Sequence, residues 1–163
     1  MGPHSPADVL DYRSLSRTLE HVTALTWSSF NLAEPGQPAE RLRGMSATAD
    51  LFPALGVSPT LGRVFTAEED QPGRNHVVVL GDNFWRERFS ADPTIIGRDI
   101  RLDGEPVTVI GVMPAGFDDQ LLWGRIDAWR PMAFTDETRA VRGGTWLQLI
   151  ARLRPGVTLA QAQ

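Results

Sequence analysis

The sequence lacks cysteine, and lysine is missing as well, so that all sixteen basic residues are arginine. Without cysteine the chain can form no disulfide, no thiolate metal site and no cysteine nucleophile. This lack does not fix the cellular compartment, because an oxidising space permits disulfides without requiring them. We interpret the missing lysine as codon bias in a GC-rich genome; the alternative is an arginine surface selected for phosphate or carboxylate recognition.

Long apolar runs are also missing. No stretch reaches the ~18 consecutive apolar residues that a membrane-spanning helix needs. Residues 1–4 lack the basic and apolar regions of a signal peptide, and we interpret them as a tag remnant. The net charge of −4 argues against nucleic acid as a partner, because phosphate binding needs a basic face. The hydrophobic fraction of 42%, with five Trp and seven Phe, is typical of a folded domain.

The N-terminal part predicts a helix followed by a hairpin. Ser5 is the expected N-cap, with Pro6 at the first helical position. Apolar residues at helical spacing predict the side that packs inward: Tyr12, Leu15, Leu19 and Val22. The turn signal at 34–38 separates two expected strands, 24–33 and 40–47.

Shorter elements are expected in the middle of the chain. Asp50 is the predicted N-cap of a short helix that Gly56 ends in a left-handed conformation. The apolar run 77–80 predicts a strand covered on both sides, and Asp82 is the predicted N-cap of the helix that follows. Because helices and strands mix without regular alternation, we expect an α+β fold.

The Asp103-Gly104 pair is the strongest short-range hairpin signal in the chain, because Asp-Gly suits a two-residue turn. Four strands are expected from here to the end: 99–102, 105–113, 126–132 and 146–153. Thr158 is the predicted N-cap of a last helix, of which the sequence holds only the first one and a half turns.

Residues that commonly carry catalysis or bind metals form no recognisable site. The histidines share no metal-ligand spacing: His4, His21 and His76. We interpret His21 as lying at the end of the first helix, where a cation suits the dipole. Ser28 and Ser29 lack a G-x-S-x-G context, and the glycines form neither a dinucleotide-binding nor a Walker motif. We therefore predict no catalytic residue, no metal site and no cofactor.

The acidic run 68–70 is the densest in the sequence. Thr66 and Glu69 have the spacing of a capping box, which favours a helix N-terminus over a calcium loop or a glycosidase carboxylate pair. Asp118 and Asp119 are interpreted as solvated loop acids. Scattered tryptophans favour core or interface packing over a stacking platform: Trp27, Trp85, Trp123, Trp129 and Trp146.

The chain also carries a series of short motifs in a defined order: 50–57 (DLFPALGV), 61–66 (LGRVFT), 68–70 (EED), 77–80 (VVVL), 85–86 (WR), 88–89 (RF), 96–98 (IGR), 102–104 (LDG), 109–114 (VIGVMP) and 153–157 (LRPGV). In this order and spacing, residues 5–163 resemble the MacB-like periplasmic core domain of ABC transporter permeases. The pairs Met113-Pro114 and Gly116-Phe117 resemble the permease group first noted in acidobacteria.

The resemblance implies a two-lobed domain that lies between transmembrane helices. A porter-like βαβ lobe would comprise 5–60 and 141–163, and a mostly β sabre-like lobe would comprise 61–140. The resemblance also implies a strand before the first helix, further helix after Gln163, one transmembrane helix before Ser5 and three after the last residue given.

The implied role is mechanical and not enzymatic. As the extracytoplasmic, periplasmic part of an inner-membrane protein, the domain would transmit ATP-driven change to substrate export or to partner proteins. The implied partners are its own transmembrane helices, an ATPase subunit or domain, a second permease copy and, in some family members, a periplasmic adaptor. The alternative is an extracytoplasmic sensor module that binds a ligand or a protein. A secreted hydrolase that uses Glu68, Asp70 or Asp118 is a third hypothesis.

Overall fold

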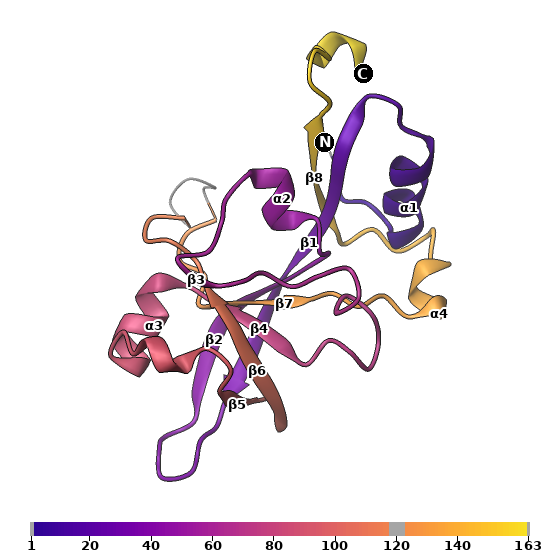
Figure 1. Cartoon of the computed structure of the whole chain (residues 1–163). Helices are drawn as coiled ribbons and strands as arrows, with labels where there is room; N and C mark the ends of the chain where they lie inside the picture. The colour runs from indigo at the N-terminus through magenta and orange to yellow at the C-terminus, as the bar shows by residue number, and fades with distance from the viewer. Residues whose placement is uncertain (1, 118–122, 163) are drawn as a thin grey trace.

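A computed structural model describes residues 2–117 and 123–162 of the chain (Figure 1). The helices are α1 (Pro6–Leu15), α2 (Leu51–Leu55), α3 (Asp82–Phe89) and α4 (Asp136–Arg139), with 3-10 turns at Pro93–Ile95 and Leu159–Gln161. The strands are β1 (Leu19–Leu32), β2 (Glu40–Ala47), β3 (Leu61–Gly62), β4 (Val77–Leu80), β5 (Asp99–Leu102), β6 (Glu105–Val112), β7 (Ala128–Pro131) and β8 (Gln148–Leu153). A large mixed sheet with few helices confirms the α+β class.

The sheet runs in the order β2-β7-β4-β6-β5-β1-β8, with β3 paired to β6. Because β1 also pairs with β2, the strands from β2 to β1 close on themselves, and β8 extends from this ring. Parallel pairs are β2–β7 and β4–β6, and the other pairs are antiparallel. None of the described helices is long and apolar enough to span a membrane.

The predicted start of α1 is confirmed. The Ser5 side chain accepts from the Asp8 N–H (3.3 Å), and the Asp8 carboxylate accepts from the Ser5 N–H (2.9 Å). The predicted inward face is wrong, because Ser16 takes an extended conformation and ends the helix. Tyr12 and Leu15 are 44% and 77% exposed.

The residues expected on later turns of that helix belong to β1 instead: Leu19, His21 and Val22. The assignment of His21 to a helix end is therefore wrong as well. The reason is tertiary: this half of β1 pairs with β8, from Leu19↔Leu153 to Leu25↔Gln148, and the pairing overrides the helical spacing.

The predicted hairpin of 24–33 and 40–47 is confirmed as β1 and β2, which pair from Leu25↔Ala47 to Leu32↔Glu40. The two faces of its distal half differ. Phe30 and Leu42 are opposite each other and buried, whereas Trp27 on the other face is 49% exposed. Gly44 is required here, because a side chain at this position would collide with the Phe30 ring.

The Asp103-Gly104 hairpin is confirmed between β5 and β6, with both residues at positive φ (51° and 81°) as a type I′ turn requires. Gly56 ends α2 at φ 67°, and β4 is buried throughout, both as expected. The strands expected at 126–132 and 146–153 are the shorter β7 and β8. The last turn begins at Thr158 with a capping box, as a 3-10 turn.

Of two predicted caps, Asp82 is wrong and Asp50 is confirmed in position only. Gly81, not Asp82, is the N-cap of α3, and Asp82 lies in the first turn and pairs with Arg86 at 2.8 Å. Asp50 stands at the N-cap position of α2, but its side chain makes no capping hydrogen bond. Its carboxylate forms an ion pair with Arg13 and does not accept from the backbone N–H groups of α2.

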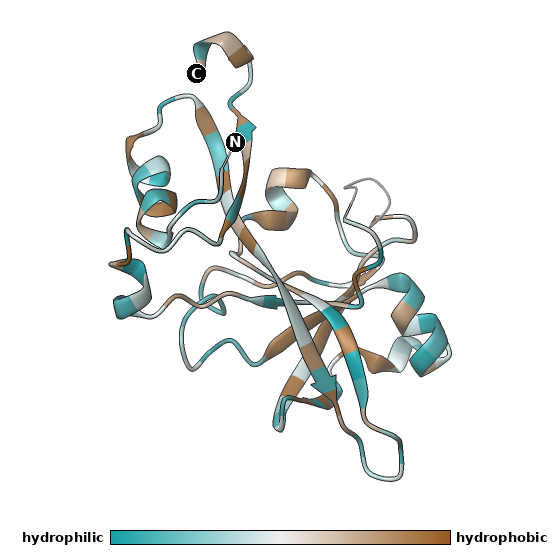
Figure 2. Ribbon diagram, turned by 180° about the vertical axis from the view of Figure 1, so that it is seen from behind, coloured by the Kyte–Doolittle hydropathy of each residue, from teal (hydrophilic) through white to brown (hydrophobic). Residues whose placement is uncertain are grey.

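Three apolar clusters form the core, and in the hydropathy colouring of Figure 2 apolar residues line the strands. The first lies under α3, the second around α2 and Trp129, and the third under α1. Strand β1 contributes to all three, through Leu32, Leu25 and Val22 respectively. The division into porter-like and sabre-like lobes stays a prediction, and β1 links the clusters on both sides of it.

Candidate functional site

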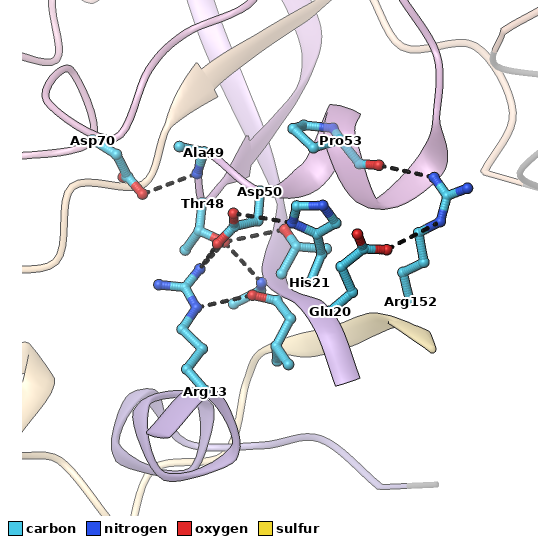
Figure 3. Close-up of polar contacts among 12 residues, drawn as sticks. Arg13, Glu20, His21, Thr48, Ala49, Asp50, Pro53, Asp70 and Arg152 are labelled. Atoms are coloured by element: carbon cyan, nitrogen blue, oxygen red, sulfur yellow. Dashed lines mark hydrogen bonds and ion pairs between the residues drawn. The ribbon is translucent and has the colours of Figure 1, made fainter. Parts of the chain in front are cut away.

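A network of polar side chains lies where α1 and β8 meet the body of the fold (Figure 3). We call it the polar junction and define it by Arg13, His21, Thr48, Asp50 and Asp70. These residues come from α1, from the first half of β1, from the segment between β2 and α2, and from the turn after β3. The junction thus connects segments that are far apart in the sequence.

Arg13 is the centre of the polar junction. From the last turn of α1, its Nε donates to the carbonyl oxygen of Val22 at 2.9 Å. Its Nη2 donates to Thr48 Oγ1 at 2.9 Å and lies 2.9 Å from Asp50 Oδ2. One guanidinium therefore connects α1, β1 and the N-terminus of α2.

Thr48 is buried, and its hydroxyl is fully used. Its Oγ1 accepts from the Ala24 N–H at 3.0 Å and from Arg13, and it lies 3.1 Å from Thr23 Oγ1. These hydrogen bonds offset the free energy that the hydroxyl group loses when it is removed from water. On the exposed side, His21 Nδ1 lies 3.6 Å from Asp50 Oδ1, close enough for an ion pair when the imidazole is protonated.

Asp70 holds two loops together. Its carboxylate accepts from the Ala49 N–H at 3.0 Å and from the Ala133 N–H at 2.7 Å. Burial raises the pKa of this carboxyl, while the two backbone donors act in the opposite direction. Each oxygen of the Asp70 carboxylate is thus occupied by a backbone N–H, which is not the arrangement of a free catalytic acid.

The predicted capping box before Asp70 forms, but on a turn and not on a helix. Thr66 N–H donates to Glu69 Oε1 (3.0 Å), and Glu69 N–H donates to Thr66 Oγ1 (3.4 Å). Arg63 binds Glu69 through two hydrogen bonds of 2.6 and 3.0 Å, and these bonds hold the pKa of Glu69 below its usual value. Glu68 is exposed.

A second contact ties β8 to the same region. Arg152 Nη1 donates to the carbonyl oxygen of Pro53 in α2 at 3.3 Å, and its Nε lies 3.9 Å from Glu20 Oε2 (Figure 3). Both elements near the chain ends, α1 and β8, therefore contact the α2 region through an arginine.

Beside the junction lies a cleft of about 140 Å³, lined in part by Arg13, Asp50, Asp70 and Arg139. Its polar groups bind mainly one another and the backbone; Arg139, for example, donates to Gln71 Oε1 at 3.2 Å. The cleft therefore offers few free polar groups to a ligand.

The structure does not bring the predicted candidates together. His4 pairs through its backbone with Leu147, and His76 lies 3.4 Å from Glu105. The hydroxyl groups of the two serines contact Ser46 and Arg41: Ser28 and Ser29, respectively. Within residues 2–117 and 123–162, no group of three or more His, Asp or Glu could hold a metal ion. Asp118 and Asp119 lie outside the described residues.

Trp85 and Trp129 are buried, as core packing predicts. Trp27 and Trp146 are 49% and 45% exposed, and interface packing stays a prediction for them. Arg13 and Thr48 were missed by sequence reasoning. A cation in the last turn of a helix is a weak signal, and nothing local points from Arg13 to a partner 35 positions away.

The comparisons with known proteins agree on one family. Over residues 2–163 the chain matches the family model of the MacB-like periplasmic core domain, and it belongs to this family. The macrolide export ATP-binding/permease protein MacB of Escherichia coli K12 is 29% identical over 120 residues, which are 71% of this chain and 18% of that protein. The chain therefore spans less than a fifth of the length of this curated relative.

Solved structures show the same fold. A domain assigned to a permease protein of Porphyromonas gingivalis has a TM-score of 0.71 at 15% identity, covering 97% of this chain and 66% of that one. The periplasmic region of MacB from Actinobacillus actinomycetemcomitans has a TM-score of 0.69 at 20% identity, covering 98% and 69%. Together with the family match, this fold identifies the chain as a MacB-like periplasmic core domain, a domain type of ABC permeases, which are membrane proteins.

Proposed function

We propose that this domain is a non-catalytic transmission element: it passes ATP-driven movement of the transmembrane helices of its permease to substrate export or to a partner protein. The observation that carries the proposal is the polar junction, which fastens α1 and the first half of β1 to the α2 region. Its partners in this role are its own transmembrane helices, an ATPase subunit or domain and a second permease copy.

The positions of the ends support this role. The first and last described segments lie at the same end of the molecule (Figures 1 and 2), so that connections from them to a membrane would leave from one side. From that end β1 runs through the whole fold, paired first with β8 and then with β2. A displacement of the terminal segments therefore acts on a continuous hydrogen-bonded strand and not on a flexible linker.

The cleft beside the polar junction is a poor site for a sensed ligand. A binding pocket needs free, convergent polar groups and a volume of ~300–1,000 Å³ for a drug-sized ligand. This cleft holds about 140 Å³, and its charged groups are largely paired internally.

Spin-label distance measurements on the full-length permease test the proposal. This domain has no cysteine, so in a full-length permease whose other cysteines have been replaced, Arg74→Cys places a single label on an exposed site of each copy. We expect the distance between labels on two copies to differ between the nucleotide-free and ATP-bound states. Identical distance distributions in both states would contradict transmission.

The control uses two labels in one copy, at Arg74→Cys and Glu137→Cys, diluted with unlabelled permease. Both positions are exposed. Because we expect the domain to move as a rigid body, this internal distance should stay constant. A change there would mean that nucleotide alters the domain itself.

A further inference from the structure

The β1–β2 hairpin carries an unusual outward face. The register places Ser29 opposite Arg43 and Asn31 opposite Arg41, on the same side as Trp27. The hairpin loop lies at the end of the molecule opposite to the termini (Figures 1 and 2). The distal half of this hairpin therefore lies far from the end where the chain would connect to a membrane.

This face forms one wall of an open groove of about 470 Å³. We call the surface that lines this groove the Trp–Arg face and define it by Trp27, Ser29, Arg41 and Arg43 of the hairpin, together with Trp123. Trp27 is 49% exposed, although a Trp on a sheet face is among the residues that gain most from burial. Trp123 also lines the groove and is half-buried against the second core cluster.

The arginines that line the groove differ in whether a carboxylate neutralises them. Arg125, at its edge, is bound by Glu87 at 2.8 Å and Asp127 at 2.9 Å. Arg41 donates to the Ser29 hydroxyl at 3.0 Å, and Arg43 binds the Asp127 carboxylate through its backbone N–H at 2.9 Å. Among the described residues, no carboxylate lies within ion-pair distance of the guanidinium of Arg41 or of Arg43. Two cationic side chains therefore remain available beside an exposed indole.

Trp and Arg are the side chains most enriched at the energetic centres of protein interfaces. An Arg guanidinium also recognises carboxylates through two parallel hydrogen bonds. The groove is open, whereas small-molecule sites enclose most of their ligand. It is also concave, whereas membrane-surface binding uses a protruding basic and apolar face.

We propose that the Trp–Arg face binds an acidic segment of another polypeptide, with an apolar side chain against Trp27 and Trp123 and carboxylates on Arg41 and Arg43. The net charge of −4 on the chain makes such a local positive site selective, because the surrounding surface repels an acidic segment. This assigns a partner-docking surface that the transmission role does not require.

The test uses the full-length permease in nanodiscs of neutral lipid and a fluorescent synthetic peptide of Glu, Gly and Leu residues. We expect saturable binding by anisotropy. Arg41→Glu and Arg43→Glu should each weaken it by about tenfold, and so should Trp27→Ala. Arg74→Glu makes the same charge change at an exposed position elsewhere and should leave the affinity unchanged.

Several results would overturn the proposal. These are the absence of saturable binding, equal binding of a peptide with Lys in place of Glu, and an equal loss of affinity in Arg74→Glu. Displacement of the peptide by anionic lipid vesicles would assign the face to a membrane surface, and displacement by millimolar inorganic phosphate would assign it to small anions. None of these outcomes changes the nucleotide-dependent distances that test transmission.

Discussion

Replacing Arg13 with Met removes the central charge of the polar junction and keeps much of the aliphatic stem. The substitution deletes the hydrogen bonds to the Val22 carbonyl oxygen and to Thr48 Oγ1, both 2.9 Å, and the ion pair with Asp50. Thr48 keeps the Ala24 N–H as a donor, so its buried hydroxyl is not left unsatisfied. The loss is therefore limited to the bonds that Arg13 itself makes.

The expected loss in the free energy of unfolding can be estimated from these contacts. Each of the two hydrogen bonds contributes about 1 kcal/mol once the partial exposure of Arg13 is taken into account. The ion pair, whose side chains are 30% and 39% exposed, adds less than about 1 kcal/mol. We expect Arg13→Met to lower the free energy of unfolding by about 2–3 kcal/mol, which corresponds to a melting temperature about 4–10 °C lower.

Thermal and urea unfolding followed by circular dichroism measure this difference. Arg17→Met is the matched control, because Arg17 is exposed and lies four positions further along, in the connection between α1 and β1. It should leave the melting temperature within about 1 °C of the original. Equal melting temperatures for the two variants would refute the claim that Arg13 fastens α1 to the body.

Three further predictions concern an ion pair and two glycines. Arg63 holds the pKa of Glu69 below its usual value, so this pair stabilises the fold at neutral pH and ceases to do so as Glu69 becomes protonated. We expect Glu69→Gln to cost about 0.5–1 kcal/mol at about pH 7 in urea unfolding, and the difference should shrink towards about pH 3; a constant difference would contradict the ion pair. Gly104 lies at φ 81° with open space around it, so Gly104→Val should cost about 1–2 kcal/mol of backbone strain, and Gly104→Asn less. Gly62→Ala should lower the melting temperature more than Gly104→Ala, because its methyl group would also collide with the Ile110 carbonyl oxygen; equal effects would refute this steric argument.

Signals whose partners lie within a few residues could be predicted from the sequence. The Ser5 cap, the left-handed Gly56 and the Asp103-Gly104 turn all depend on backbone geometry that neighbouring residues impose. The family could also be predicted, because many short motifs in one order are more specific than any single motif.

Features set by distant partners could not be predicted. The helical spacing through Leu19 and Val22 was misleading, because the pairing of β1 with β8 depends on residues about 130 positions away. Asp50 looked like a cap, yet its carboxylate binds Arg13, which only the folded chain brings near. The polar junction escaped prediction for the same reason, since its members are individually ordinary polar residues.

The pairing of β1 with β8 also determines the order in which the domain can form during synthesis. The first half of β1 leaves the ribosome early, but its partner strand Gln148–Leu153 is made about 130 residues later. Until then Val22 and Ala24 cannot be covered by Leu147 and remain open to water or to chaperones. The hairpin of β1 and β2 can pair before β8 has been made, so the pairing of β8 with β1 comes late in the assembly of the domain.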